Sequence, residues 1–278
     1  MGLVINDKEW AGKYKLKDIQ NKIILGDTIE VMKKMKPKSV DMVFIDPPYF
    51  LQLPKKRLIR WEVKTDVEGV NEQWDKFASF KEYDNFIKKL LKGVKRVMKP
   101  NATIWVIGTY HNIFRTGKIM YDLGFWMLND VSWFKTNPMP NWLNVRFTNA
   151  TETLLWAVKD KKVKKYVYNK EVAREYSMKD FNSKIVFNVW RLPICMGGQR
   201  LKNADGKKLH STQKPEALLE RIIRISTNPD DVVFDPVAGT GTTGYVAKKL
   251  GRNFIMIDKE EKYVKAMQKR LKGLQTKL

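Results

Sequence analysis

Residues 233–243 of the chain read Val233-Phe234-Asp235-Pro236-Val237-Ala238-Gly239-Thr240-Gly241-Thr242-Thr243. This pattern predicts a buried strand that ends at the aspartate, a tight glycine turn and a helix that begins at the threonines. Backbone N–H groups in such a turn can approach a ligand closely, and Asp258, which follows the next predicted strand, can hydrogen-bond ribose hydroxyls. The Lys-Ser/Thr ending of a phosphate-binding loop is absent, so the spacing favours a nucleoside ligand. A purely structural strand–helix turn is the alternative.

On both sides of this stretch, short apolar strands alternate with amphipathic helices, which is typical of an α/β fold with a mostly parallel sheet. Strands are expected over residues 22–25, 40–45, 102–107, 126–134, 153–158, 231–234 and 253–257. Helices are expected over residues 29–35, 80–98, 111–123, 215–226 and 242–250, and from residue 260 onward. Between residues 159 and 213 the periodicity is lost, and this part of the chain is predicted to be an insertion.

The composition is strongly basic. Lys and Arg number 53 against 30 Asp and Glu, giving a formal net charge of +23 in a chain of 278 residues. A globular chain with such an excess is expected to bind a polyanion, either nucleic acid or an anionic membrane surface. The alternative is a surface of solvated ion pairs, as in proteins from hot environments.

The cysteine count and the hydropathy pattern exclude further classes of protein. The single cysteine, Cys195, excludes an intrachain disulfide, and only two histidines accompany it, so we expect no metal site. No apolar run approaches the roughly 20 residues of a membrane span, and the first ten residues do not resemble a signal peptide. A soluble, cytoplasmic protein is therefore expected.

A second motif, Asp46-Pro47-Pro48-Tyr49, lies at the carboxyl end of the buried strand 40–45, the edge where open α/β sheets bind ligands. The prolines fix the backbone and lack N–H donors, so the Asp46 carboxylate and the Pro47 carbonyl can both accept hydrogen bonds from one exocyclic amine. Tyr49 offers a flat face to a base turned out of a helix. Without the glycine motif, an ordinary proline turn would be the simpler interpretation.

Taken together, the two motifs resemble the S-adenosylmethionine-dependent, amino-methylating DNA methyltransferases in their circularly permuted (beta) order. The resemblance is nearest to the HinfI-type and cell-cycle-regulated adenine-N6 enzymes, whose target is GANTC. The stretches that carry it are residues 46–53, 74–77, 105–112, 136–141 and 210–215. It implies a Rossmann-like, mostly parallel methyltransferase sheet, with a catalytic half over residues 1–135, a target-recognition insertion over 136–210 and a cofactor-binding half over 211–278.

The resemblance also implies an activity. The chain is expected to transfer a methyl group from S-adenosylmethionine to the N6 amine of a flipped adenine in double-stranded DNA, within a restriction-modification system, and a homodimer is left open. Residues of the catalytic tetrad would be Asp46, Pro47, Pro48 and Tyr49. Residues near the cofactor would be Asp27, Thr212, Lys214, Pro215, Asp235, Pro236, Ala238, Gly239, Gly241, Thr242 and Asp258. Asp27 has an alternative role as a helix N-cap, with Glu30 completing a capping box.

DNA contacts are expected from three basic or polar segments. The loop over residues 54–64 and the basic run over 159–170 are expected to touch phosphates, and the segment 137–148 to read base edges or fill the gap left by a flipped base. The candidate residues are Arg57, Arg60, Lys64, Asn141, Trp142, Asn144, Arg146, Lys161, Lys162, Lys164 and Lys165. The charge excess is expected to gather with Tyr49 on one DNA-binding face.

Some positions depart from the family pattern. Val237 and Ala238 stand where an aromatic residue usually follows Asp-Pro, and Thr151 stands where a histidine is usual. The additional C-terminal domain of the nearest relatives is expected to be missing. Two other functions stay open: cytosine-N4 methylation, against which Asp rather than Ser at position 46 argues, and non-catalytic binding of nucleic acid on the same fold.

Overall fold

The protein is described from a computed structural model, which covers residues 2–51, 58–59, 66–67, 72–141, 145–203 and 205–275. The strands are β1 (Val4–Asn6), β2 (Lys22–Leu25), β3 (Val40–Ile45), β4 (Leu58–Ile59), β5 (Asp66–Val67), β6 (Met98–Gly108), β7 (Trp126–Lys135), β8 (Thr151–Val158), β9 (Val189–Leu192), β10 (Val232–Asp235) and β11 (Asn253–Asp258). The helices are α1 (Leu16–Ile19), α2 (Thr28–Lys34), α3 (Phe80–Val97), α4 (Ile113–Asp122), α5 (Lys170–Phe181), α6 (Glu216–Ser226), α7 (Thr242–Lys249) and α8 (Glu261–Gln275).

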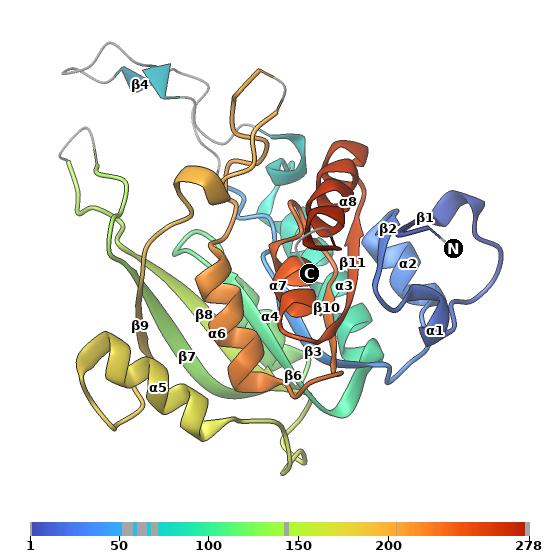
Figure 1. The fold of residues 1–278 in the computed structure, drawn as a ribbon, viewed down its shortest axis with the longest axis horizontal. Helices are drawn as coiled ribbons and strands as arrows, with labels where there is room; N and C mark the ends of the chain where they lie inside the picture. The colour runs from blue at the N-terminus through green and yellow to red at the C-terminus, as the bar shows by residue number, and fades with distance from the viewer. Residues whose placement is uncertain are drawn as a thin grey trace.

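Nine of these strands form one sheet in the order β1-β2-β11-β10-β3-β6-β8-β7-β9 (Figure 1). Neighbours from β1 to β6 are parallel, β8 runs antiparallel to both β6 and β7, and β9 pairs parallel with β7. β4 and β5 pair antiparallel with each other, apart from this sheet. The α/β, mostly parallel fold expected from the sequence is confirmed.

Two apolar cores cover the two faces of the sheet. In β3, Val43 and Ile45 enter one core, whereas Met42 and Phe44 enter the other, as the two-residue period of a strand requires. α2, α3 and α4 pack against the first core, and α5, α6, α7 and α8 against the second. Because both faces of the central strands are covered, these strands are apolar throughout, which is why the sequence identified them.

The ligand-binding edge lies where the chain changes direction across the sheet. β3 and β10 pair in parallel, with Phe234 beside Val43, so Asp235 and Asp46 follow them at the same edge. From this pair the sheet continues through β6 on one side and through β11 on the other. Such a switch point leaves a crevice beyond the carboxyl ends of the strands.

The predicted strands and helices are confirmed, with small differences at their ends. Residues 159–213, however, are more regular than expected, because α5 and β9 form there and β9 extends the main sheet. α5 contacts its neighbour partly through charge: Asp180 pairs with the buried Arg221 of α6 at 2.6 Å. An ion pair leaves no hydrophobic period in the sequence, and β9 is only four residues long.

Candidate active site

The turn that follows β3 is fixed by a buried carboxylate. Asp75 accepts hydrogen bonds from the backbone N–H groups of Tyr49, Phe50 and Leu51, at N–O distances of 2.6, 2.7 and 2.9 Å. Phe50 has a φ of 51°, in the left-handed region that costs a non-glycine residue about 1–2 kcal/mol. Three charge-assisted hydrogen bonds offset that cost, since each contributes roughly 1.5–3 kcal/mol. Asp75 therefore stabilises a backbone conformation of the turn that would be unfavourable without these hydrogen bonds.

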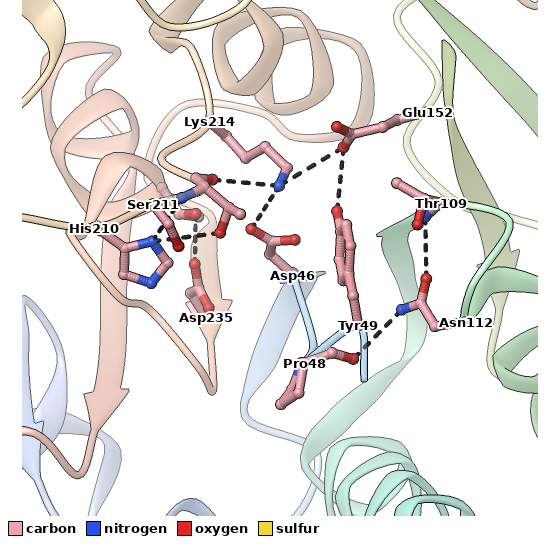
Figure 2. A network of polar contacts seen from close by, with 12 residues as sticks. Asp46, Pro48, Tyr49, Thr109, Asn112, Glu152, His210, Ser211, Lys214 and Asp235 are labelled. Atoms are coloured by element: carbon pink, nitrogen blue, oxygen red, sulfur yellow. Dashed lines mark hydrogen bonds and ion pairs between the residues drawn. The ribbon is translucent and has the colours of Figure 1, made fainter. Parts of the chain in front are cut away.

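The preceding residue of the turn is anchored from the other side of the sheet. The carbonyl oxygen of Pro48 accepts hydrogen bonds from Tyr83 Oη of α3 at 2.9 Å and from Asn112 Nδ2 at 3.5 Å (Figure 2). Asn112 Oδ1 in turn accepts from the backbone N–H of Thr109, just beyond β6. The Asp46–Tyr49 turn is thus built onto α3 and the end of β6.

Asp46 makes one ion pair and keeps one free oxygen. Its Oδ2 atom lies 2.8 Å from Lys214 Nζ, while Oδ1 is buried and has no hydrogen-bond partner among the described residues. Burial raises the pKa of Asp46, and the Lys214 ammonium opposes that rise. A buried acceptor without a partner is costly unless a ligand supplies a donor.

Lys214 connects Asp46 to further charged residues. Glu152, at the start of β8, pairs with Lys135 at 2.9 Å and with Lys214 at 3.7 Å, and accepts a hydrogen bond from Tyr49 Oη at 3.1 Å (Figure 2). Burial alone would raise the pKa of Glu152, but the two ammonium groups outweigh burial and hold it below its ordinary value. The two negative charges of Asp46 and Glu152 are thus balanced by the two positive charges of Lys135 and Lys214.

Two further carboxylates, one at the end of β10 and one at the end of β11, accept hydrogen bonds from the glycine turn that follows β10. Asp235 accepts hydrogen bonds from the Val237 N–H at 3.1 Å and from Thr243 Oγ1 at 2.6 Å, and burial raises its pKa to about 7. Asp258, after β11, accepts from the N–H groups of Gly239 at 2.8 Å and Glu260 at 2.8 Å, and burial raises its pKa to about 6. Each Asp258 oxygen still has a lone pair for a hydroxyl donor.

Both glycines of this turn are required by the backbone itself. Gly239 has a φ of 52° and Gly241 a φ of 70°, the left-handed region. A Cβ atom on Gly241 would lie 2.5 Å from Met267 Cγ, and one on Gly239 would lie 3.2 Å from His210 Nε2. The turn is therefore also structural, as the alternative interpretation held, while its Gly239 faces the site.

The two motifs share one cavity of about 370 Å³ at the switch point. Most of the residues assigned from the sequence to catalysis and to the cofactor line it, namely Asp27, Asp46, Pro47, Pro48, Tyr49, Thr212, Lys214, Asp235, Pro236, Ala238, Gly239, Thr242 and Asp258. Pro215 and Gly241 do not line it and instead cap α6 and α7.

Asp27 caps a helix and also lines the cavity. Its carboxylate caps α2 by accepting from the N–H groups of Ile29 at 2.9 Å and Glu30 at 3.2 Å. Glu30 does not close a capping box, because it pairs with Lys33 at 2.7 Å. Asp27 nevertheless lies on the cavity wall, where the second lone pairs of its carboxylate can meet a ligand.

Aromatic rings form part of the cavity wall although Val237 and Ala238 are small. Trp74 stacks on His210 with ring centroids 5.2 Å apart, and Tyr263 lies against the other side of His210 at 4.9 Å. Burial, together with Lys214, Lys262 and Arg200, lowers the pKa of His210 to about 4. The imidazole is therefore neutral near pH 7 and acts as an apolar, stacked surface.

The expected DNA contacts are only partly brought to this edge. Arg146 donates to Tyr110 Oη at 3.1 Å, just beyond the end of β6, and Asn141 donates to the Arg146 carbonyl oxygen at 2.7 Å. The segment 145–148 is therefore beside the cavity, and it exposes Val145 and Phe147. Arg57, Arg60, Lys64, Trp142 and Asn144 lie outside the described residues.

The basic run over residues 159–170 does not share the face of Tyr49, so that expectation is wrong. β8 runs antiparallel to β6, and Lys159 Nζ donates to the carbonyl oxygen of Met98 at the start of β6, whereas the cavity lies beyond its other end. β6 spans 11 residues, so about 30 Å separates the two ends. Figure 1 shows the connection from β8 to α5 at the far end of the sheet from β4. There Lys162, Lys164 and Lys165 border a shallow depression with Lys38 and Lys159.

The sequence did not identify several residues of the site. Asp75 and Asn112 fall within stretches that carry the family resemblance, but nothing local marks them as anchors of a turn 26 and 64 positions away. Lys135 and Glu152 stand at the end of β7 and the start of β8, on facing ends of an antiparallel pair. A charged residue at the end of a strand, next to the apolar Trp133–Phe134 pair in β7 and the apolar run Leu154–Val158 in β8, was the available signal.

The fold and this cavity define a class: a Rossmann-like domain with a cavity beyond the carboxyl ends of its parallel strands, where a glycine turn lies beside a buried carboxylate. Among solved structures, the M1.HpyAVI–SAM complex matches with a TM-score of 0.62 and 30% identity, covering 90% of this chain and 98% of that one. The cytosine-N4-specific PvuII DNA methyltransferase has a TM-score of 0.68 over 90% of this chain and 85% of its own, but with 24% identity it supports the fold alone.

The sequence comparisons identify the family. Residues 40–269 match the DNA methylase family, and the chain belongs to it. The Type II methyltransferase M.HinfI of Haemophilus influenzae is 48% identical over 263 residues, which cover 94% of this chain and 71% of that protein. The Type II methyltransferase M2.DpnII of Streptococcus pneumoniae is 41% identical over 272 residues, covering 96% of this chain and 97% of that protein.

Proposed function

We propose that this DNA methylase transfers a methyl group from S-adenosylmethionine to the N6 amine of an adenine turned out of double-stranded DNA. The observation that carries the proposal is the unpartnered, buried Oδ1 atom of Asp46, a residue that lines the same cavity as the glycine turn. An exocyclic amine supplies the missing donor, and the carbonyl of Pro47 can accept its second hydrogen.

The cavity fits the cofactor by its donor set and its walls. Asp258 can accept from both ribose hydroxyls, and the neutral His210 with Trp74 offers a stacked apolar surface. Thr28, which also lines the cavity, has a buried hydroxyl with no partner among the described residues. When bound, S-adenosylmethionine supplies a methyl group activated by a sulfonium centre.

The chain's own part in the reaction is to orient the amine. Hydrogen bonds from the amine to Asp46 Oδ1 and to the Pro47 carbonyl would favour a pyramidal nitrogen whose lone pair points away from Asp46. The fixed turn supplies these acceptors without reorganisation, so most of the rate enhancement would come from positioning and electrostatics. Tyr49, whose ring is beside Asp46, would form one wall for the base.

We further propose that DNA lies across the edge that carries Arg146 and the exposed Val145 and Phe147. Residues 136–210 would act in target recognition, with β8 and β9 as framework strands of the main sheet. The lysines near residue 162 would then bind the backbone of a DNA segment other than the one that holds the target base. A GANTC-like site, adenine specificity, action in the cytoplasm and a homodimer are proposed from the family resemblance.

Cytosine-N4 methylation is the second candidate, since a cytosine amine offers the same two donors to the same acceptors. The two are separated by incubating purified protein with methyl-labelled S-adenosylmethionine and plasmid DNA, then identifying the modified nucleoside by mass spectrometry. We expect N6-methyladenine, and sequencing of the modified plasmid gives the site. We expect the Asp46→Ala variant to bind the cofactor but transfer no label. Label in N4-methylcytosine, or in no nucleoside, would refute the proposal.

A further inference from the structure

A carboxylate that recognises an amine must present a defined oxygen. The two oxygens of a free aspartate exchange when the side chain turns about its last torsion, which is broad. In this site the turn is restrained, because Lys214 Nζ holds one carboxylate oxygen, Oδ2, at 2.8 Å and leaves the other, Oδ1, as the unpartnered atom. Lys214 thereby fixes the orientation of the carboxylate plane and the position of the oxygen that can accept a further hydrogen bond.

The ammonium group of Lys214 is surrounded by acceptors from the protein itself. It has three hydrogens, and three acceptors surround it: Asp46 Oδ2 at 2.8 Å, the Thr212 carbonyl at 3.4 Å and Glu152 Oε2 at 3.7 Å (Figure 2). Its side chain is only 6% exposed. Two of its hydrogens are engaged by Asp46 and by the Thr212 carbonyl, and the Glu152 carboxylate lies just beyond hydrogen-bond distance as a second ion-pair partner.

Glu152 balances the charge of this cluster. Burial would lower the pKa of Lys214, but Asp46 and Glu152 together raise it above its ordinary value and keep it charged. With Asp46 as its only carboxylate partner, Lys214 would put its whole charge on the reactive carboxylate and weaken it as a hydrogen-bond acceptor. Lys135, at 2.9 Å, supplies the second positive charge that lets Glu152 stay ionised.

We propose that Glu152, with Lys135 and Lys214, is a positioning residue of the methyl-transfer site: it holds the Lys214 ammonium on Asp46 Oδ2, so that Oδ1 is presented to the target amine. This inference rests on the proposed function, because it concerns the same carboxylate. The four side chains come from the turn after β3, the end of β7, the start of β8 and the segment before α6. Substrate selection and electrostatics therefore depend on residues that need not touch the substrate.

The test compares Lys214→Met, Lys214→Arg and Glu152→Gln with the wild type. Lys99→Met is the matched control, because Lys99 forms another Lys–Asp pair, with Asp41 at 2.8 Å, near the start of β3. Cofactor affinity is measured by calorimetry, which also shows that each variant folds. The rate of methyl transfer is measured in single turnovers at saturating cofactor and DNA, from pH 5 to 9.

We expect Lys214→Met to lower the single-turnover rate by about 100-fold, as displaced reacting groups do, with an unchanged cofactor Kd. The acidic limb of the pH–rate profile of this variant should move to higher pH. Lys214 opposes the rise in the pKa of Asp46, so its removal lets that pKa rise further. Glu152→Gln should lower the rate about tenfold at unchanged Kd, Lys214→Arg should restore most of the rate, and Lys99→Met should match the wild type.

A raised cofactor Kd with an unchanged saturating rate in Lys214→Met would overturn the proposal and assign the lysine to the cofactor. An acidic limb that does not move would also overturn it. If the wild-type protein transfers no methyl group, the proposed function fails, and the carboxyl carbon of Asp46 is then titrated by carbon-13 NMR. An identical titration of Asp46 in wild type and Lys214→Met would refute the network without any appeal to activity.

Discussion

Replacing Asp75 by asparagine tests whether the catalytic turn is held in place from outside. In the native protein, Asp75 Oδ1 accepts from the Tyr49 and Phe50 N–H groups, and Oδ2 accepts from the Leu51 N–H at 2.9 Å. Asparagine can keep the first two bonds, but its NH₂ group then faces the Leu51 N–H, donor against donor. The loss of one charge-assisted bond, and of the charge on the other two, should weaken the closed turn by about 2–3 kcal/mol.

That energy corresponds to roughly a 100-fold shift of the equilibrium from the closed toward the open turn. We therefore expect Asp75→Asn to lower the single-turnover methylation rate by up to 100-fold, while cofactor affinity changes little. Hydrogen exchange should accelerate at the amides of residues 49–51. Asp84→Asn, which removes a partly exposed partner of Arg115, is the control and should leave both measurements unchanged. A wild-type rate together with unchanged amide protection in Asp75→Asn would refute the reasoning.

Three further predictions follow from the site and the surface. Because hydroxyls donate to the ionised form of Asp258, whose pKa is about 6, cofactor affinity measured by calorimetry should fall about tenfold from pH 7 to pH 5, and Asp258→Asn should remove this dependence. Tyr49→Phe should lower the methylation rate less than tenfold, because Glu152 keeps both of its ammonium partners. Tyr49→Ala should lower the rate at least 100-fold. Equal rates in the Phe and Ala variants would exclude a role for the ring. Replacing Lys161, Lys162, Lys164 and Lys165 by glutamine should weaken binding equally on cognate and unrelated duplexes and flatten the salt dependence, with no change in the saturated methylation rate; a loss confined to the cognate duplex would contradict a backbone contact.

The sequence predicted the fold because its central strands are buried on both faces. Continuous apolar runs such as those of β3 and β10 carry a strong signal, and the turn residues that follow them identify the edge of the sheet. The glycine turn and the Asp46–Tyr49 turn, which we propose to hold the cofactor and the target base, stand at that edge for the same reason. Each is a local motif, and the parallel pairing of β3 and β10 places the two motifs side by side.

The remaining part of the site depends on contacts between distant residues. Glu152 is 106 positions from Asp46, and the link between them passes through the ammonium of Lys214, so no local pattern records it. The basic run near residue 162 was misplaced for a related reason. The charge density along the sequence indicated that a polyanion could bind. The end of the sheet at which the basic run lies follows only from the antiparallel direction of β8.

The strand order also dictates when the site can exist during synthesis. β1 and β2 reach the rest of the sheet only through β11, and the acceptor carboxylate after β3 meets its cavity wall only after β10 has paired. β1 and β2 are therefore made long before β11, the strand that connects them to the rest of the sheet. A nascent chain that has not yet reached residue 258 lacks both Asp258 and the strand that joins β1 and β2 to β10, so the wall of the cavity is incomplete until β11 has been made.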